Sequence, residues 1–380
     1  MKVLKNMKLK RMIALAIVFV MVLTALSACG TKKNANQDDS VSEESISEEA
    51  ADEGLVDEDL VDDSSDADNA SVSTSSSSFE TVSVSSVPEG FSERDFDYSY
   101  QNALNISLAD NGSKVSGSGA EVDGNTITIT KEGTYIITGT LSEGQIVIDL
   151  PGENDKVQLV LDNVSITNSS SAALYVKNAD KVFVTTTEGS VNNVSSTGSF
   201  VQTDDNNVDG AIYSKDDIVF NGMGTLNVIS QEGHGIVSKN DLKITSGTYS
   251  IQSAKKGLQG KDMVGIAGGD ITIDADGDGI SSVYAVLYDG DIKINAGDDG
   301  INVKENDENN LPIITLAGGT LTIDSGDDGI QTTGELELLG TKINIVSGGG
   351  YENAAEHYGD MMFGQMGGWG GMGQGGPAFG

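Results

Sequence analysis

The chain of 380 residues has one cysteine, four prolines and few aromatic residues, which make up 5% of it. A single thiol cannot form an intramolecular disulfide, so this excludes a small fold held together by disulfides. Basic residues are also scarce, because 22 Lys and Arg stand against 58 Asp and Glu, for a formal charge of −36. That charge repels phosphate backbones and anionic membrane surfaces, so it excludes nucleic acid as a partner and favours cations.

The one cysteine ends a targeting pattern. An almost wholly apolar run over residues 12–26 follows five basic residues: Lys2, Lys5, Lys8, Lys10 and Arg11. A basic start and a short apolar run before small residues are typical of an export signal, and a membrane span needs roughly 20 residues. Leu26-Ser27-Ala28-Cys29 resembles the lipobox of bacterial lipoproteins. The resemblance implies cleavage before Cys29, lipidation of its sulfur, and a lipid-anchored place on the extracellular face of the cell membrane.

Residues 34–93 contain no Lys or Arg and are rich in Asp, Glu and Ser. Low hydrophobicity with one sign of charge buries too little surface to offset the entropy of ordering, so a disordered tether is expected. We therefore divide the chain into a signal peptide over 1–28, an acidic Ser-rich linker over 29–95, a folded domain over 96–350, and a flexible Gly/Met-rich tail over 351–380.

Short segments that alternate apolar and polar residues begin near Val115, as in Thr126–Thr130. A period of two predicts half-buried strands. A repeat emerges when each glycine that precedes an aliphatic residue is aligned. Gly235, Gly257, Gly279 and Gly300 are 22, 22 and 21 residues apart, Gly329 follows 29 residues later, and Gly210 stands 25 residues before Gly235.

This repeat predicts the fold class. Two or three strands of about 3–5 residues in each unit of roughly 22, joined by glycine turns, are typical of a parallel β-helix. We predict an all-β, right-handed parallel β-helix (solenoid) between the disordered N-terminal tether and the Gly/Met-rich tail.

Aspartates precede the glycine in three successive repeats, beginning at Asp276, Asp298 and Asp327. Stacked strands place equivalent carboxylates about 5 Å apart, where like charges repel. Either some of them protonate or a cation lies among them, and Ca²⁺ suits oxygen ligands outside a cell. We predict calcium as a cofactor, with metal ligands among Asp209, Asp276, Asp278, Asp298, Asp299, Asp327 and Asp328. The alternative is that each aspartate merely precedes a left-handed glycine in a turn and stays solvated.

Lysines form a second ladder, because Lys215, Lys239 and Lys261 occupy equivalent places in consecutive repeats. One interpretation is a ladder of salt bridges to nearby aspartates. The alternative is a lysine base acting on a uronate sugar beside calcium, although acidic surroundings disfavour a neutral lysine. Tyrosine rings can stack on sugars or simply pack. The candidate carbohydrate-binding residues are Tyr213, Lys215, Lys239, Lys261, Tyr284 and Tyr288.

The segment from Asp209 to Asp217, the segment from Gly235 to Lys239 and the two Asp-Asp-Gly-Ile turns together resemble a known family. It is the family of secreted, calcium-binding, polysaccharide-binding β-helix proteins of cellulolytic Gram-positive bacteria, which are similar in fold to pectate lyases. The resemblance covers about residues 115–347 and implies calcium and carbohydrate binding. In one repeat Lys255 and Lys256 replace the acidic pair, so a metal site is not expected there.

The expected function is that of a monomeric cell-surface lipoprotein that binds polysaccharide without catalysis and contacts the membrane only through its lipid anchor. The polysaccharide is of the plant cell-wall type, either acidic, such as polygalacturonate, or cellulose. One alternative is a pectate-lyase-like polysaccharide lyase that uses calcium and a base from Lys215, Lys239 or Lys261. The other is a structural adhesin or spacer.

Overall fold

A computed structural model describes residues 87–152, 154–305 and 311–348. Cys29, the predicted signal peptide, most of the predicted linker and the predicted tail lie outside these residues. The described part contains a short helix, α2 (Glu93–Phe96), and strands β1–β26. No helix in this part is long and apolar enough to cross a membrane.

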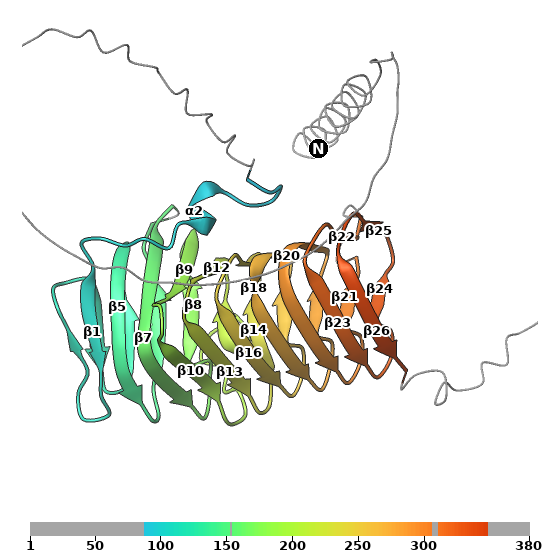
Figure 1. Cartoon of the computed structure of the whole chain (residues 1–380). Coiled ribbons are helices and arrows are strands. Elements are labelled where there is room, and N and C mark those ends of the chain that lie inside the picture. Colours follow the sequence, from blue (N-terminus) through green and yellow to red (C-terminus); the bar gives the residue numbers. More distant parts are fainter. Residues whose placement is uncertain (1–86, 153, 306–310, 349–380) are drawn as a thin grey trace, which may run out of the picture. The chain divides into compact units, whose positions relative to one another are not determined.

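The strands form two sheets, here called sheet A and sheet B (Figure 1). Sheet A has 16 strands: β1 (Leu104–Leu108), β2 (Lys114–Val115), β5 (Gly133–Leu141), β7 (Lys156–Asn168), β9 (Lys181–Thr186), β10 (Val191–Ser196), β12 (Asp217–Gly222), β13 (Thr225–Ser230), β15 (Asp241–Ile244), β16 (Thr248–Ser253), β18 (Met263–Ala275), β20 (Tyr284–Ala296), β22 (Ile313–Leu316), β23 (Thr320–Ser325), β25 (Glu335–Leu338) and β26 (Lys342–Ser347). Sheet B has ten strands: β3 (Ala120–Asp123), β4 (Thr126–Ile129), β6 (Gln145–Asp149), β8 (Leu174–Asn178), β11 (Gly210–Ser214), β14 (His234–Ser238), β17 (Leu258–Gly260), β19 (Ile280–Ser282), β21 (Ile301–Val303) and β24 (Ile330–Thr332).

The predicted fold class needs correction. We predicted a right-handed parallel β-helix of separate strands of about 3–5 residues, whereas the structure is an all-β arrangement of two sheets around one core. Three strands, β7, β18 and β20, run for 13 residues, and each pairs with two separate strands of one neighbouring repeat. The first strands are also not repeats of the pattern, because β1–β2 and β3–β4 are antiparallel pairs. The strand β18 continues through Gly268 and Gly269, although the sequence pattern takes such glycines as the end of a strand.

The pairing register confirms most of the sequence alignment. Ile236 pairs with Leu258, and the column continues through Ile280, Ile301 and Ile330 in parallel strands. The first copy was aligned one residue out, because Ile212 pairs with Ile236, so Ala211 rather than Gly210 is the counterpart of Gly235. Ile236, Leu258, Ile280 and Ile301 belong to the core, which draws on both sheets, and the partly buried Ile330 packs against it.

Gly279 shows why glycine recurs in the repeat. It does not adopt a positive φ, so the interpretation as a left-handed turn glycine is wrong. A Cβ at Gly279 would instead lie 2.3 Å from Cγ2 of Ile294 and 2.7 Å from the carbonyl oxygen of Gly300. The glycine therefore makes room for an isoleucine later in the same repeat. Four equivalent glycines meet an isoleucine in the same way: Gly235, Gly257, Gly300 and Gly329.

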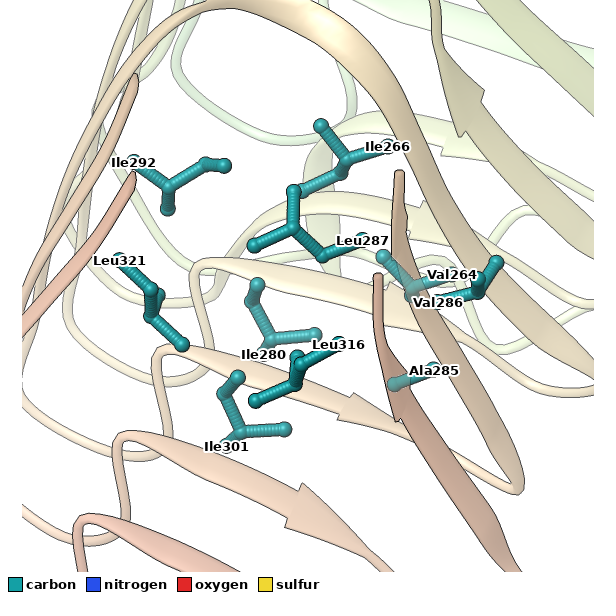
Figure 2. A pocket seen from close by; sticks show the side chains of 10 residues that line it. All are labelled: Val264, Ile266, Ile280, Ala285, Val286, Leu287, Ile292, Ile301, Leu316 and Leu321. Atoms are coloured by element: carbon teal, nitrogen blue, oxygen red, sulfur yellow. The ribbon is translucent and has the colours of Figure 1, made fainter. Parts of the chain in front are cut away.

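A small cavity lies in the apolar part of the structure, and Figure 2 shows its lining side chains turned toward one another. Strands of both sheets contribute, for example Ile280 and Ile301 from sheet B and Leu287 and Leu321 from sheet A. A volume of about 20 Å³ holds at most one water molecule. This cavity is therefore no place for a sugar, and a binding site has to be sought on the outer faces.

Residues 87–97, which include α2, form a strap against sheet A (Figure 1). The carboxylate of Asp95, fully buried, lies 3.3 Å from Nζ of Lys181, and its carbonyl oxygen accepts hydrogen bonds from Asn221 and Thr245. We had assigned residues up to 95 to a disordered linker. Residues 87–95 are instead ordered, since Phe91 and the buried polar contacts of Asp95 attach them to the body.

Candidate functional site

The outer face of sheet B divides into an apolar half and a polar half. Because side chains alternate along a strand, the residue after each core aliphatic of this sheet points outward. In the later repeats these outward residues are polar, and we call Gln259, Ser281, Asn302 and Gln331 the central column, since they pair in register. Gln259 Oε1 and Asn302 Oδ1 are buried without a hydrogen-bond partner.

In the earlier repeats the same face is covered. Tyr175, Tyr213 and Val237 pack with Val208 and Phe200 of the segment that precedes β11. Tyr213 is 1% exposed, and its hydroxyl donates to the carbonyl oxygen of Asn206. Burial raises the pKa of the Tyr213 hydroxyl above its usual range. This ring therefore packs and offers no face to a sugar, contrary to its predicted role.

The turns that lead into sheet B carry a second column, which we call the turn ladder: His234, Lys256, Asp278, Asp299 and Asp328. Backbone bonds set this alignment, because the N–H group of each following glycine donates to the carbonyl oxygen of the next ladder residue, as from Gly257 to Asp278 at 3.0 Å. The ladder thus runs from a histidine through a lysine to three aspartates at one edge of the central column.

Three carboxylates gather at the acidic end of the turn ladder. Oxygens of Asp278, Asp298 and Asp299 lie within 4.8 Å of one another. Asp278 and Asp299 are 3% and 2% exposed, whereas Asp298 is exposed. Burial raises the pKa of the Asp299 carboxyl, and its neighbours Asp278 and Asp298 raise it further. The cluster therefore concentrates three carboxylate groups, two of them buried, at one end of the turn ladder.

Asn302 makes this cluster suitable for a hard cation. Its Nδ2 donates to Asp299 at 2.6 Å and to Asp278 at 3.2 Å, while its Oδ1 is buried without a partner. Rotation of the amide would present that oxygen to the carboxylates. Carboxylate and amide oxygens are the ligands that Ca²⁺ prefers, so the residues present fit this ion. Asn302 was missed from the sequence, although it follows Asp-Asp-Gly-Ile directly.

The other predicted metal ligands lie elsewhere. Asp276 is exposed and outside the cluster. Asp327 and Asp328 belong to the next repeat, where the N–H group of Asp328 donates to Asp299 at 3.1 Å. Asp209 lies beside His234, with Oδ2 at 3.6 Å from Nε2. Stacking thus brings together only part of the predicted set: both members of the Asp298–Asp299 pair, and Asp278 from the preceding repeat.

His234 is held neutral. Its Nδ1 accepts a hydrogen bond from the backbone N–H of Lys256 at 3.1 Å, which requires that this nitrogen carry no proton. Burial lowers the pKa of His234 to about 4, while the neighbouring Asp209 acts in the opposite direction. The histidine therefore supports the backbone at Lys256, as an uncharged acceptor.

The predicted lysine ladder forms the opposite edge of the same face. Ser214, Ser238 and Gly260 pair in register, so the lysines that follow them, Lys215, Lys239 and Lys261, stack. Lys215 and Lys261 are exposed. Lys239 lies with Nζ 5.2 Å from the centre of the Tyr213 ring, and Lys177, one repeat earlier, pairs with Asp149 at 2.7 Å.

The other two predicted tyrosines belong to sheet A. Tyr284 begins β20 and is half-buried. Tyr288 packs edge-on against Phe91 with ring centres 6.1 Å apart, and its hydroxyl donates to the carbonyl oxygen of Glu89. Tyr288 thus holds the strap and does not share a face with the lysine ladder.

Comparison with known proteins identifies the family. The profile of carbohydrate-binding domain-containing proteins matches residues 123–284 and 282–365, which is more than half of the chain. The chain therefore belongs to the family of carbohydrate-binding domain-containing proteins.

Two relatives carry the comparison further. A carbohydrate-binding domain-containing protein of Acetivibrio thermocellus is 40% identical over 138 residues, which are 36% of this chain and 48% of the relative. The aligned part thus spans about half the length of that curated relative. The solved structure of a polysaccharide lyase-like protein from C. thermocellum, a gadolinium derivative, is 31% identical, with a TM-score of 0.58 over 63% of this chain and 99% of that chain. The two proteins share the all-β fold.

The state of His234 leads to a prediction about pH. A histidine whose pKa falls on folding stabilises the protein above its unfolded value near 6.5, and this stabilisation is lost as the pH falls toward 4. In urea unfolding with chelator, the wild type should lose on the order of 2 kcal/mol relative to His234→Gln between pH 7 and pH 4.5. The glutamine keeps an acceptor without a titrating group. Parallel curves for the two proteins would contradict the assignment.

Proposed function

We propose that this chain binds a polysaccharide along the outer face of sheet B, next to a Ca²⁺ ion held by Asp278, Asp298 and Asp299. The observation that carries the proposal is the cluster of three carboxylate groups, two of them buried, beside a column of polar side chains of which three are partly exposed. Family membership supports carbohydrate as the ligand. The relative that is named polysaccharide lyase-like supports a polymer as the form of the carbohydrate.

The ligand face suits an extended glycan. Amide and hydroxyl groups of the central column hydrogen-bond to sugar hydroxyls, and successive repeats present them at ~4.8 Å intervals. Lys215, Lys239 and Lys261 line one edge, and the ion would lie at the other, where it supplies positive charge and free coordination positions for a sugar carboxylate. An acidic polymer of the plant cell-wall type, such as polygalacturonate, uses both edges, whereas cellulose uses only the central column.

The arrangement gives less support to the alternatives. A lysine base in a lyase requires a desolvated environment, and Lys215 and Lys261 are exposed. A mere spacer or adhesin does not require buried carboxylates in a cluster, since burial of a charge is costly. Binding without catalysis is therefore the function that we propose.

We also propose that the protein is displayed outside the cell on a lipid at Cys29, which stands on the sequence alone. Intact-mass analysis of the chain from a Gram-positive host should give a mature N-terminus at Cys29 with added acyl mass. Cys29→Ser should appear in the medium without that mass. An uncleaved, unmodified wild-type chain would overturn the anchor while leaving the ligand face untouched.

Calcium should stabilise the folded protein. A ligand that binds only the native state stabilises it by about 2.7 kcal/mol at a hundredfold excess over Kd, so the melting temperature should rise with CaCl₂ and return with chelator. Asp299→Asn should weaken calcium binding at least about tenfold, which calorimetry would detect. Asp276→Asn, a matched change at an exposed aspartate outside the cluster, should bind as the wild type does. A melting temperature that does not change with calcium or with chelator would refute the calcium site.

Glycan binding is tested by calorimetry against polygalacturonate and soluble cellulose fragments, with calcium and with chelator. Gln259→Ala removes an amide from the central column and should weaken binding about fivefold to tenfold, as expected for the loss of one or two hydrogen bonds. Thr272→Ala, on an exposed position of β18 in sheet A, should leave the affinity unchanged. Equal losses in both variants would move the site away from sheet B.

A further inference from the structure

In the turn ladder, the positively charged Lys256 stands immediately before three aspartates. Nζ of Lys256 lies 3.0 Å from Oδ2 of Asp278 and 2.8 Å from Oγ of Ser281. The lysine thus reaches from its own repeat into the next one. Its ammonium group contacts both a carboxylate of the acidic cluster and a member of the central column.

Asp278 needs this contact in the absence of a metal ion. Its side chain is 4% exposed, and a buried carboxylate without a cationic partner is strongly destabilising. Asn302 donates to its other oxygen at 3.2 Å, but an amide carries no net charge. Lys256 is the cation that balances Asp278 in this structure.

We propose that Lys256 is a built-in cation that competes with the metal ion for Asp278, and that metal binding releases its ammonium group toward an acidic ligand on sheet B. Both halves of this inference rest on the proposed calcium site, and the second half rests in addition on the proposed binding of glycan. A divalent ion among the three carboxylates repels an ammonium group a few ångströms away. The side chain of Lys256 is 32% exposed, so its ammonium group can leave Asp278 without crossing the core.

The released ammonium group remains at the ligand face. Ser281, its other partner, belongs to the central column and is partly exposed. A charged group beside it is well placed for a charge-assisted hydrogen bond to a sugar carboxylate. Metal and acidic ligand then strengthen each other's binding by the same factor, because coupling between two sites is reciprocal. A neutral glycan gives no such coupling, so Lys256 distinguishes acidic from neutral polymers only when the ion is bound.

The proposed competition between Lys256 and the metal ion is tested without any glycan. Calcium binding is measured by calorimetry, and Tb³⁺ luminescence provides a second readout, for the wild type, Lys256→Met and Lys255→Met. Lys255 is the adjacent, exposed lysine, so its variant has the same change of net charge. Lys256→Met should bind calcium at least about tenfold more tightly than the wild type, and Lys255→Met within about threefold. Metal-free Lys256→Met should also melt below the wild type and recover when saturated with calcium.

Unchanged or weaker calcium binding by Lys256→Met would overturn the competition. If that variant does not fold, Lys256→Gln carries the same expectation, since it can keep hydrogen bonds to Asp278 and Ser281 without the charge. Lys256→Arg, which keeps the charge, should bind calcium as the wild type does.

The proposed release of Lys256 toward an acidic ligand is tested by measuring the affinities for polygalacturonate and for a neutral glucan, each at saturating calcium and with chelator. Calcium should raise the affinity of the wild type for the acidic polymer and leave that for the neutral one unchanged. In Lys256→Met, the increase that calcium causes in the logarithm of the affinity for the acidic polymer should be at most half of that in the wild type. An equal increase in the variant would overturn the proposed release of Lys256. A wild type that binds calcium but no glycan would refute the proposed function, while the calcium titrations would still decide the competition.

Discussion

Parallel backbone pairing between successive repeats is the constraint on which the rest of this structure depends. Once Ile236 is paired with Leu258, every other position of the two repeats is aligned as well, in the turns and on the outer faces. The spacing of about 4.8 Å then turns any recurring residue type into a column. Columns of aliphatic residues form the core, and a column of amide and hydroxyl groups forms a polar surface. In a column of carboxylates the like charges repel one another, and a cation bound among them reduces that repulsion.

The sequence predicts the all-β character and most of the register, because a period of two and a recurrent Gly-aliphatic pair are strong local signals. It does not predict how long a strand runs. Residues 263–275 contain three glycines and yet continue as the single strand β18. The alignment also failed where the signal is degenerate, at Gly210 and Ala211, since either small residue satisfies the close approach to a neighbouring side chain.

The sequence predicted the residue types of the candidate site better than their positions relative to one another. Spacing identifies both aspartates of each acidic pair but cannot say which one borders the sheet, so Asp276 and Asp278 were given equal weight. Tyr213 looked like a platform for a sugar because nothing in its own strand reveals that Val208 and Phe200 cover it. Asn302 lies within reach of the local motif, since it donates to Asp299 three residues before it. The pairing of Lys256 with Asp278 arises between repeats, and a local motif does not contain that information.

The strap has a mechanical consequence. Asp95 is bonded to Lys181 of β9, Asn221 of β12 and Thr245 just beyond β15, which belong to three successive repeats. A pull on the chain from its N-terminal side is therefore shared among several strands in the middle of sheet A before it reaches β1. The attachment lies on sheet A, so tension that reaches it is borne by strands other than those that carry the central column of sheet B.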